Sequence, residues 1–236
     1  MSGAFYFRQF LAGRDFAASD VLARQMLNFA YAIGDRDAGV AVLVDPAYAP
    51  DELVDVVAAD GLEVVGAVAT HYHPDHVGGD MMGHQLAGVA ELAARDLAIH
   101  VQRDEVPWVS RVTGLSPDAL RAHEPGDVVT VGDVLITLVH TPGHTPGSQC
   151  LLVDGRLVSG DTLFISGCGR TDLPGSDPLE MYRSLHERLA VVDDGVVLYP
   201  GHLYAPEPFA PLGHVRATNP VLAPTSAAQW LNLFGP

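Results

Sequence analysis

The 236-residue sequence contains no lysine: all 13 basic residues are arginine, whereas 29 residues are acidic. The missing lysines exclude Schiff-base and lysine-nucleophile chemistry. The formal net charge of -16 makes the surface repel phosphate backbones and anionic lipids, and no run of arginines indicates a basic patch. We therefore expect neither nucleic acid nor a membrane as a partner.

Cysteine is almost as scarce. Cys150 and Cys168 are the two cysteines, and their spacing excludes a zinc ribbon or a CxxC redox motif. So few cysteines fit a reducing compartment. Residues 1–10 lack the pattern of a signal peptide, and the apolar runs are far shorter than the roughly 20 residues of a membrane-spanning helix. These observations predict a cytoplasmic protein.

The order of strands and helices predicts the fold class. Strands are expected at 5–11, 27–33, 39–44, 64–69, 97–102, 128–131, 134–140, 149–153, 156–159 and 195–199, and helices at 50–60, 83–94 and 177–191. Both halves run through strands, a helix and a strand, which predicts two similar sheets packed face to face with helices outside, an α/β layered sandwich. We expect one domain over residues 1–236 with a ligand-bearing core at about 27–204. Residues 103–124 are interpreted as a lid, and 205–236 as an irregular tail with one short helix.

Metal-binding residue types are densest in the stretch Thr70-His71-Tyr72-His73-Pro74-Asp75-His76, which follows the apolar strand at 64–69. Residues two apart in an extended chain point to the same side, so His71 and His73 can converge on one point. Pro74 suits the first position of a helix, whose first turn would aim Asp75 and His76 at a second, displaced point. Imidazole and carboxylate are ligands that zinc, iron and manganese accept.

Three predicted strands in the second half also end in a metal-binding residue, namely His144, Asp161 and His202. Together with the first stretch, they give seven candidate ligands: His71, His73, Asp75, His76, His144, Asp161 and His202. Seven ligands are too many for one tetrahedral zinc, but they fit two metals that share a carboxylate. Asp161 is the natural bridge because a carboxylate has two oxygens.

The other histidines lack this placement. Without a preceding strand end or ligand spacing, a histidine is more often a surface group or a hydrogen-bonded core residue. We assign that ordinary role to His84, His100, His123, His186 and His214, and we leave His140 out of the site.

These motifs resemble a known superfamily. THYHPDHVGG is similar to the HxHxDH signature of metallo-β-lactamase-fold hydrolases, and HTPGHTPGS, SGDTLF and YPGH are similar to its later ligand motifs in the same order. The resemblance implies a four-layer αββα sandwich with the metals at one edge between the sheets.

Two groups within that superfamily are similar to this chain: glyoxalase II and the persulfide dioxygenases. GDTLFISGCGRTDLPGSD and GHLYAP…LGHVRATNP resemble both; CGRTD and the opening FRQF (7–10) favour the dioxygenases, whereas YPGH and LGHVRATNP favour short bacterial hydrolases. Glyoxalase II similarity implies thioester hydrolysis, a first metal at His71, His73 and His144, a second at Asp75, His76 and His202, and Asp161 as the bridge. Dioxygenase similarity implies oxidation of glutathione persulfide by one iron at His71, His144 and Asp161.

The chain departs from glyoxalase II in being too short for the helical domain that supplies basic residues to the glutathione carboxylates. Glutathione or another small thiol therefore remains open as the carrier.

Our first interpretation is a hydrolase with two divalent ions, zinc before iron, that cleaves such a thioester through a metal-bound hydroxide. Asp75 orients the water, and Arg170 either binds a substrate carboxylate or pairs with Asp172. The alternative is a mononuclear iron persulfide dioxygenase. A non-catalytic protein of the same fold is disfavoured because no ligand position is missing, and a homo-oligomer is compatible with all of these.

Overall fold

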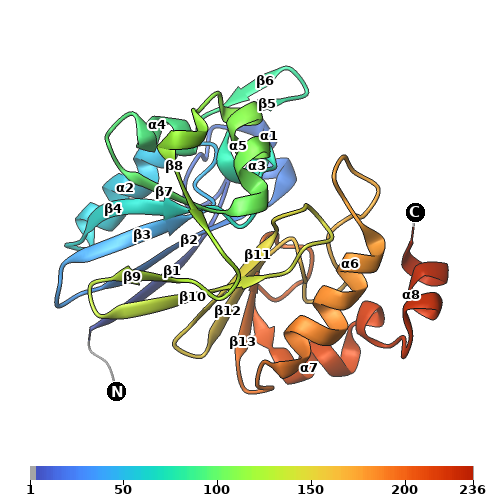
Figure 1. The fold of residues 1–236 in the computed structure, drawn as a ribbon. Helices are drawn as coiled ribbons and strands as arrows, with labels where there is room; N and C mark the ends of the chain where they lie inside the picture. Colours follow the sequence, from blue (N-terminus) through green and yellow to red (C-terminus); the bar gives the residue numbers. More distant parts are fainter. Residues whose placement is uncertain (1–3, 236) are drawn as a thin grey trace.

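Two six-stranded sheets form the centre of the molecule in this computed structural model, which describes residues 4–235 (Figure 1). The strand orders are β1-β2-β3-β4-β7-β8 and β14-β13-β12-β11-β10-β9. The first sheet contains β1 (Phe5–Leu11), β2 (Phe29–Asp35), β3 (Val40–Val44), β4 (Glu63–Val68), β7 (Ala98–Gln102) and β8 (Leu120–His123). The second contains β9 (Val128–Val131), β10 (Val134–His140), β11 (Gln149–Val153), β12 (Arg156–Gly160), β13 (Val197–Pro200) and β14 (Ala210–Pro211).

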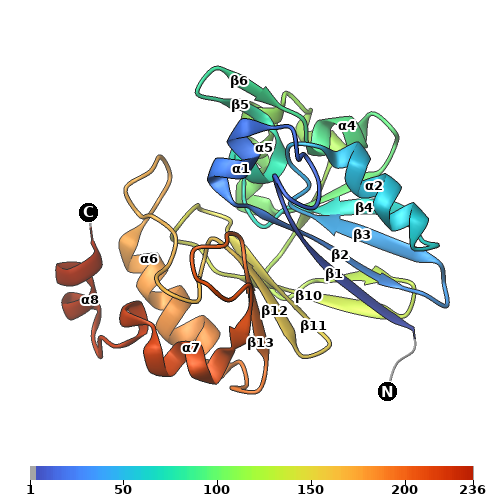
Figure 2. The same cartoon turned by 180° about the vertical axis from the view of Figure 1, so that it is seen from behind.

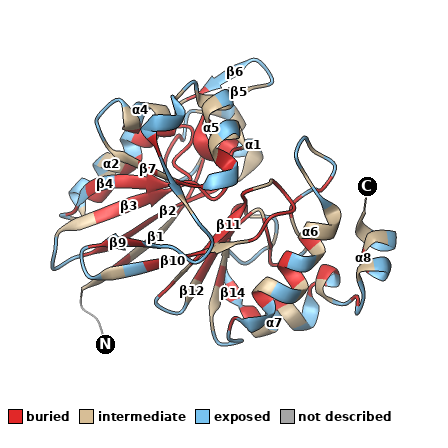
Figure 3. Cartoon of the chain, viewed as in Figure 1, coloured by how far each residue is buried: buried red, intermediate tan, exposed pale blue. Residues whose placement is uncertain are grey.

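Alternate side chains of the central strands enter two different cores. Tyr31 and Ile33 of β2 pack between the sheets, together with Ile136 of β10. Their neighbours Ala32 of β2 and Leu43 of β3 belong to a second core on the outer face of the first sheet. Successive side chains of a strand point to opposite faces, so both faces of these strands are buried and their sequences are almost wholly apolar. Figure 3 shows the buried residues where the sheets face each other and beneath the helices.

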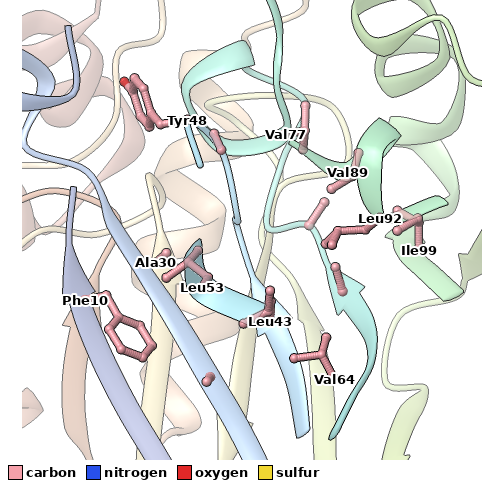
Figure 4. Close-up of a cluster of buried hydrophobic side chains, with 14 of the residues drawn as sticks. Phe10, Ala30, Leu43, Tyr48, Leu53, Val64, Val77, Val89, Leu92 and Ile99 are labelled. Carbon is pink, nitrogen blue, oxygen red and sulfur yellow. The ribbon is translucent and has the colours of Figure 1, made fainter. Parts of the chain in front are cut away.

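Helices cover the outer face of each sheet, as Figures 1 and 2 show from opposite sides. On the first sheet's side lie α1 (Val21–Met26), α2 (Pro50–Ala59), α3 (Pro74–Val77), α4 (Val89–Ala93) and α5 (Val106–Thr113), and on the second sheet's side lie α6 (Pro178–Arg183), α7 (Leu212–Thr218) and α8 (Ala227–Phe234). Figure 4 shows Leu53 of α2 and Leu92 of α4 in one core with Leu43 and Ile99 of the first sheet. The predicted four-layer αββα sandwich is therefore confirmed.

Consecutive strands of each sheet form hairpins. β2 and β3 pair antiparallel, as do β11 and β12. The turn between β11 and β12 has Asp154 at φ 43° and Gly155 at φ 71°, the left-handed conformations that Asp-Gly favours in a two-residue hairpin. The one helix expected over residues 177–191 instead continues from α6 into a π-helical turn, η3 (Ser184–Arg188), and a 3₁₀ turn, η4 (Leu189–Val191).

The helix expected over residues 83–94 is wrong in its first half. That stretch begins with a small hairpin of β5 (Gly79–Met81) and β6 (His84–Leu86), and α4 starts only at Val89. Met82 at φ 55° and Gly83 at φ 85° form the turn. A methionine rarely adopts this backbone conformation, so the sequence does not indicate the turn.

The lid expected over residues 103–124 is also wrong, because the segment supplies one strand of the first sheet and one of the helices on that sheet's side. It contains η1 (Arg103–Glu105), α5, η2 (Pro117–Ala119) and β8, and β8 pairs in parallel with β7. Trp108 of α5 stacks on Tyr72 with ring centroids 4.8 Å apart. The elements are short and each depends on tertiary packing, which sequence periodicity does not report.

The irregular tail expected at 205–236 is more ordered than predicted. It contains β14, α7, η5 (Pro220–Leu222) and α8. Trp230 of α8 is fully buried, and its Nε1 donates to the carbonyl of Val221 at 2.9 Å. This burial fixes α8 on the second sheet's side. Among residues 4–235, no helix combines the length and the apolar character needed to cross a bilayer.

Candidate metal centre

The seven candidate ligands come from four loops that follow β4, β10, β12 and β13. Gln149 N donates to the carbonyl of Thr70 at 2.9 Å, which joins the two sheets beside the first loop. Gly201 N donates to the carbonyl of Gly160 at 2.8 Å and joins the last two loops. A Cβ at Gly201 would lie 2.3 Å from Asp161 Oδ1, so only glycine permits this close approach.

The first ligand set consists of His71, His73 and His144. The Nδ1 atom of His73 lies 3.1 Å from His71 Nε2 and 2.9 Å from His144 Nε2. Three ring nitrogens that face one another at this spacing form a donor group for one cation.

The second ligand set consists of Asp75, His76 and His202. His76 Nε2 lies 3.2 Å from His202 Nε2 and 3.6 Å from Asp75 Oδ2, and His202 Nε2 lies 3.5 Å from the same oxygen. Pro74 begins α3, as expected, and places Asp75 and His76 in its first turn. The two sets are adjacent, since the rings of His71 and His76 are 4.1 Å apart.

Asp161 lies between the two sets. Its Oδ2 is 3.7 Å from His144 Nε2 and 3.4 Å from His202 Nε2, and its Oδ1 is 3.5 Å from His76 Nε2. Oδ1 is buried and accepts no hydrogen bond among the described residues. A buried carboxylate oxygen without a donor is costly unless a cation neutralises it, so these residues fit a metal.

Oxygen atoms fix the outer nitrogen of four ligand histidines. The acceptors for Nδ1 are Thr70 Oγ1 for His71 (3.0 Å), Asp45 Oδ2 for His76 (2.8 Å), the Arg170 carbonyl for His144 (2.8 Å) and the Met26 carbonyl for His202 (2.8 Å). Donation by Nδ1 leaves Nε2 with its lone pair directed at the centre. This arrangement orients a histidine for metal binding.

The charges of the centre also favour a cation. Burial and the neighbouring histidines hold the pKa of His71 well below its usual range, and burial contributes most to lowering that of His73 to about 3. Burial also opposes charge on His76, but the carboxylates of Asp75, Asp161 and Asp45 outweigh it and raise its pKa to about 10. Burial opposes ionisation of Asp161 as well, yet the nearby histidines hold its pKa well below normal. Asp161 therefore remains ionised and requires positive charge beside it.

Three residues that the sequence did not indicate support the second set. Asp45 accepts from Thr70 N (2.8 Å) and Thr70 Oγ1 (2.6 Å) as well as from His76. Asn28 Nδ2 donates to Asp75 Oδ2 at 3.0 Å, and Tyr48 OH donates to Asn28 Oδ1 at 3.0 Å. Asp45 directly follows β3, so the rule used for the other strand ends was able to find it.

Glu105 was also missed, and it supports the loop that carries His144. Its Oε1 accepts from Thr145 Oγ1 at 2.6 Å and from Gly147 N at 2.7 Å. The side chain is buried, and burial raises the pKa of Glu105 to about 7. Its position in the segment interpreted as a lid concealed this role.

Arg170 does not reach the ligand sets with its side chain. The guanidinium pairs with Asp172 through two hydrogen bonds, Nε to Oδ1 at 2.9 Å and Nη2 to Oδ2 at 2.8 Å, and its side chain is 69% exposed. The salt-bridge alternative is thus the one present, while the backbone carbonyl of Arg170 holds His144.

A second histidine cluster lies at the edge of the first sheet. His100 on β7 and His123 on β8 stack with Nδ1 and Nε2 2.8 Å apart. Asp127 Oδ2 is 3.4 Å from His123 Nδ1, on the far side of that ring. Within residues 4–235 no third donor completes a metal-binding group with this pair.

Comparison with known proteins agrees with this geometry. The family model described as the metallo-beta-lactamase superfamily matches residues 25–202. The chain is 29% identical to the mitochondrial persulfide dioxygenase ETHE1 of Homo sapiens, over 97% of this chain and 86% of that protein. It is 34% identical to the hydroxyacylglutathione hydrolase of Maricaulis maris, over 79% of this chain and 68% of that protein.

A solved structure shows the same likeness in three dimensions. The crystal structure of ETHE1 from Myxococcus xanthus superposes with a TM-score of 0.78 at 27% identity and covers 97% of this chain and 89% of that one. The match spans both sheets and the helices outside them. The chain therefore belongs to the metallo-beta-lactamase superfamily.

Proposed function

We propose that this chain is a metal-dependent hydrolase that cleaves the thioester of a small thiol, with two zinc ions as the expected metals. The observation that carries the proposal is the presence of two complete ligand sets side by side, with Asp161 between them. The proposal assigns a second ion to Asp75, His76 and His202.

Each residue of the centre has a role in the proposed reaction. His71, His73 and His144 would hold one ion, Asp75, His76 and His202 the other, and Asp161 both. Such ions, when bound, supply Lewis acidity toward the thioester carbonyl and lower the pKa of water from about 15.7 to about 7. Asn28 fixes one oxygen of Asp75, and we assign the other oxygen to orient the attacking water. The departing thiol has a pKa of about 8.5, so no general acid is needed to expel it.

A specific observation favours a second candidate, a mononuclear iron persulfide dioxygenase. The similarity to the human ETHE1 protein covers 97% of this chain, whereas the similarity to the Maricaulis maris hydrolase covers 79%. In this reading His71, His144 and Asp161 would hold one iron. Zinc has no redox chemistry, so metal content separates the two candidates.

The test supplies an acyl thioester and a thiol persulfide to zinc-loaded and iron-loaded protein, anaerobically and in air. We expect two metal ions per chain and thioester cleavage that does not require oxygen. One iron per chain, oxygen uptake with the persulfide and no thioester turnover with either metal would overturn the hydrolase proposal in favour of the dioxygenase.

A further inference from the structure

A cavity of about 920 Å³ lies directly against the metal centre. Five of the seven candidate ligands border it, namely His73, Asp75, His144, Asp161 and His202. A substrate that reaches the metals must occupy this space, so its remaining walls determine which thiol and which acyl group fit.

Most of that remaining wall is apolar. Met26, Met81, Met82, Phe164, Leu173 and Tyr204 line it. Three of the chain's five methionines are thus in one cavity. Met82 at the tip of the β5–β6 hairpin is 90% exposed and Tyr204 is 52% exposed, although both are large and apolar. Methionine adapts its shape to apolar ligands, and exposed apolar side chains at a cavity mark a binding surface.

The cavity offers almost nothing to a carboxylate. Apart from the candidate ligands, the charged residues lining it are Asp80 and Arg170. Arg170 is already paired with Asp172 through two hydrogen bonds. Asp80 carries the same charge as a carboxylate substrate, and the chain as a whole has a net charge of -16. Away from the metal centre, an anionic thiol would therefore meet an apolar wall and Asp80, and among residues 4–235 the one cation of this wall, Arg170, is already paired.

We infer that the thiol carrier is an uncharged molecule without carboxylates and that the acyl group is apolar. Glutathione, with two carboxylates, is then a poor carrier for this chain. This inference rests on the proposed thioester hydrolysis and adds to it the chemical class of the substrate.

The experiment compares two thioesters of the same hexanoyl group with zinc-loaded protein. One carries N-acetylcysteamine, a neutral thiol, and the other carries glutathione. We expect kcat/KM to be at least about tenfold higher for the neutral ester, because like charges placed together are a strong source of discrimination. Added salt should narrow the difference, since it screens charge. An acetyl ester of the neutral thiol should react more slowly than the hexanoyl ester.

Two variants test the cause. Asp172→Asn frees Arg170 to meet a substrate carboxylate, so the preference for the neutral ester should shrink. Asp51→Asn is the matched control because Asp51 is also an exposed acid paired with an arginine, Arg95, at 2.5 Å, and it does not line the cavity. We expect it to leave the preference unchanged.

Equal or faster cleavage of the glutathione ester, or a preference that Asp172→Asn and salt leave unchanged, would overturn the inference while the hydrolase function stands. Failure to cleave any of the thioesters would overturn both.

Discussion

Among residues 4–235, we compare two clusters of histidines that differ in what surrounds the rings: the metal centre, built from loops of both sheets, and the pair His100 and His123 at the edge of the first sheet. In the metal centre, histidines from several loops converge, and oxygen acceptors hold the outer nitrogen of four of them. At the sheet edge, His100 and His123 meet through one nitrogen each, 2.8 Å apart. The carboxylate of Asp127 lies beside the opposite nitrogen of His123.

The difference shows what makes a group of histidines a metal centre. Close ring nitrogens are common to both clusters, so the proximity of histidines alone does not make a metal centre. The centre adds a third donor, carboxylates that stay ionised in the interior, and hydrogen bonds that direct the lone pairs inward. The edge pair has none of these, and burial together with the neighbouring His123 and Arg121 lowers the pKa of His100 to about 4.

The largest expected effect comes from removing the carboxylate shared by the two sets. Asp161→Asn should lower the metal content of both sets and cost more activity than His202→Ala, which affects one set. We expect kcat/KM to fall by more than the roughly 10- to 100-fold that follows removal of a residue that supports a metal ligand. Metal stoichiometry and kcat/KM measure it. Equal metal content and equal activity in the two variants would contradict the bridging role.

The next prediction compares the same substitution at an acid beside a histidine in each of the two clusters. Asp45→Asn weakens the acceptor of His76 Nδ1 and of the Thr70 backbone and hydroxyl, so metal affinity should fall by roughly 10- to 100-fold. Asp127→Asn is the matched control, because Asp127 also lies beside the Nδ1 atom of a histidine but in the cluster without a third donor. It should leave metal affinity unchanged. Competition with a chelator measures both, and similar losses in the two variants would refute the distinction.

The sequence singled out the seven candidate ligands because they lie shortly after strands or in the first turn of a helix, and such positions follow from local patterns. It also predicted the sheets, since β2 and β3 stand out in the chain as short, almost wholly apolar runs. The supporting residues escaped prediction for a different reason. Asn28 reaches Asp75 and Glu105 reaches Thr145 across long stretches of chain, so their roles exist only in the folded protein.

The errors in the fold have the same origin. Met82 adopts a positive φ that its residue type disfavours, and α5 and α8 are too short to be stable without tertiary contacts. Local sequence cannot report conformations that distant packing imposes.

A smaller effect is expected at Glu105, which holds the loop of His144, the ligand that completes the first set. Glu105→Ala would leave Thr145 Oγ1 and Gly147 N without their buried acceptor and should destabilise the fold by about 1–3 kcal/mol. Metal affinity should fall by about tenfold, at the low end for a supporting residue. Glu105→Gln keeps an acceptor oxygen and should retain most of the stability and most of the metal affinity. Chelator competition measures the metal affinity and urea unfolding measures the stability. Unchanged metal affinity in the alanine variant would show that the loop of His144 keeps its conformation without Glu105.

The smallest expected effect concerns His100 of the edge pair and depends on pH. Its folded-state pKa of about 4 lies below the roughly 6.5 of an unfolded histidine. Between these values the unfolded chain binds a proton at this position and the folded chain does not. Acidification from pH 7 to pH 5 therefore favours unfolding, and the stability present above the unfolded pKa is lost as the pH falls. Because the ring is partly exposed, we expect a loss on the order of 1 kcal/mol. Urea unfolding of metal-free wild type and His100→Asn at both pH values isolates this contribution, which the variant should lack. An equal pH response in the two proteins would mean that the edge pair titrates like ordinary surface histidines.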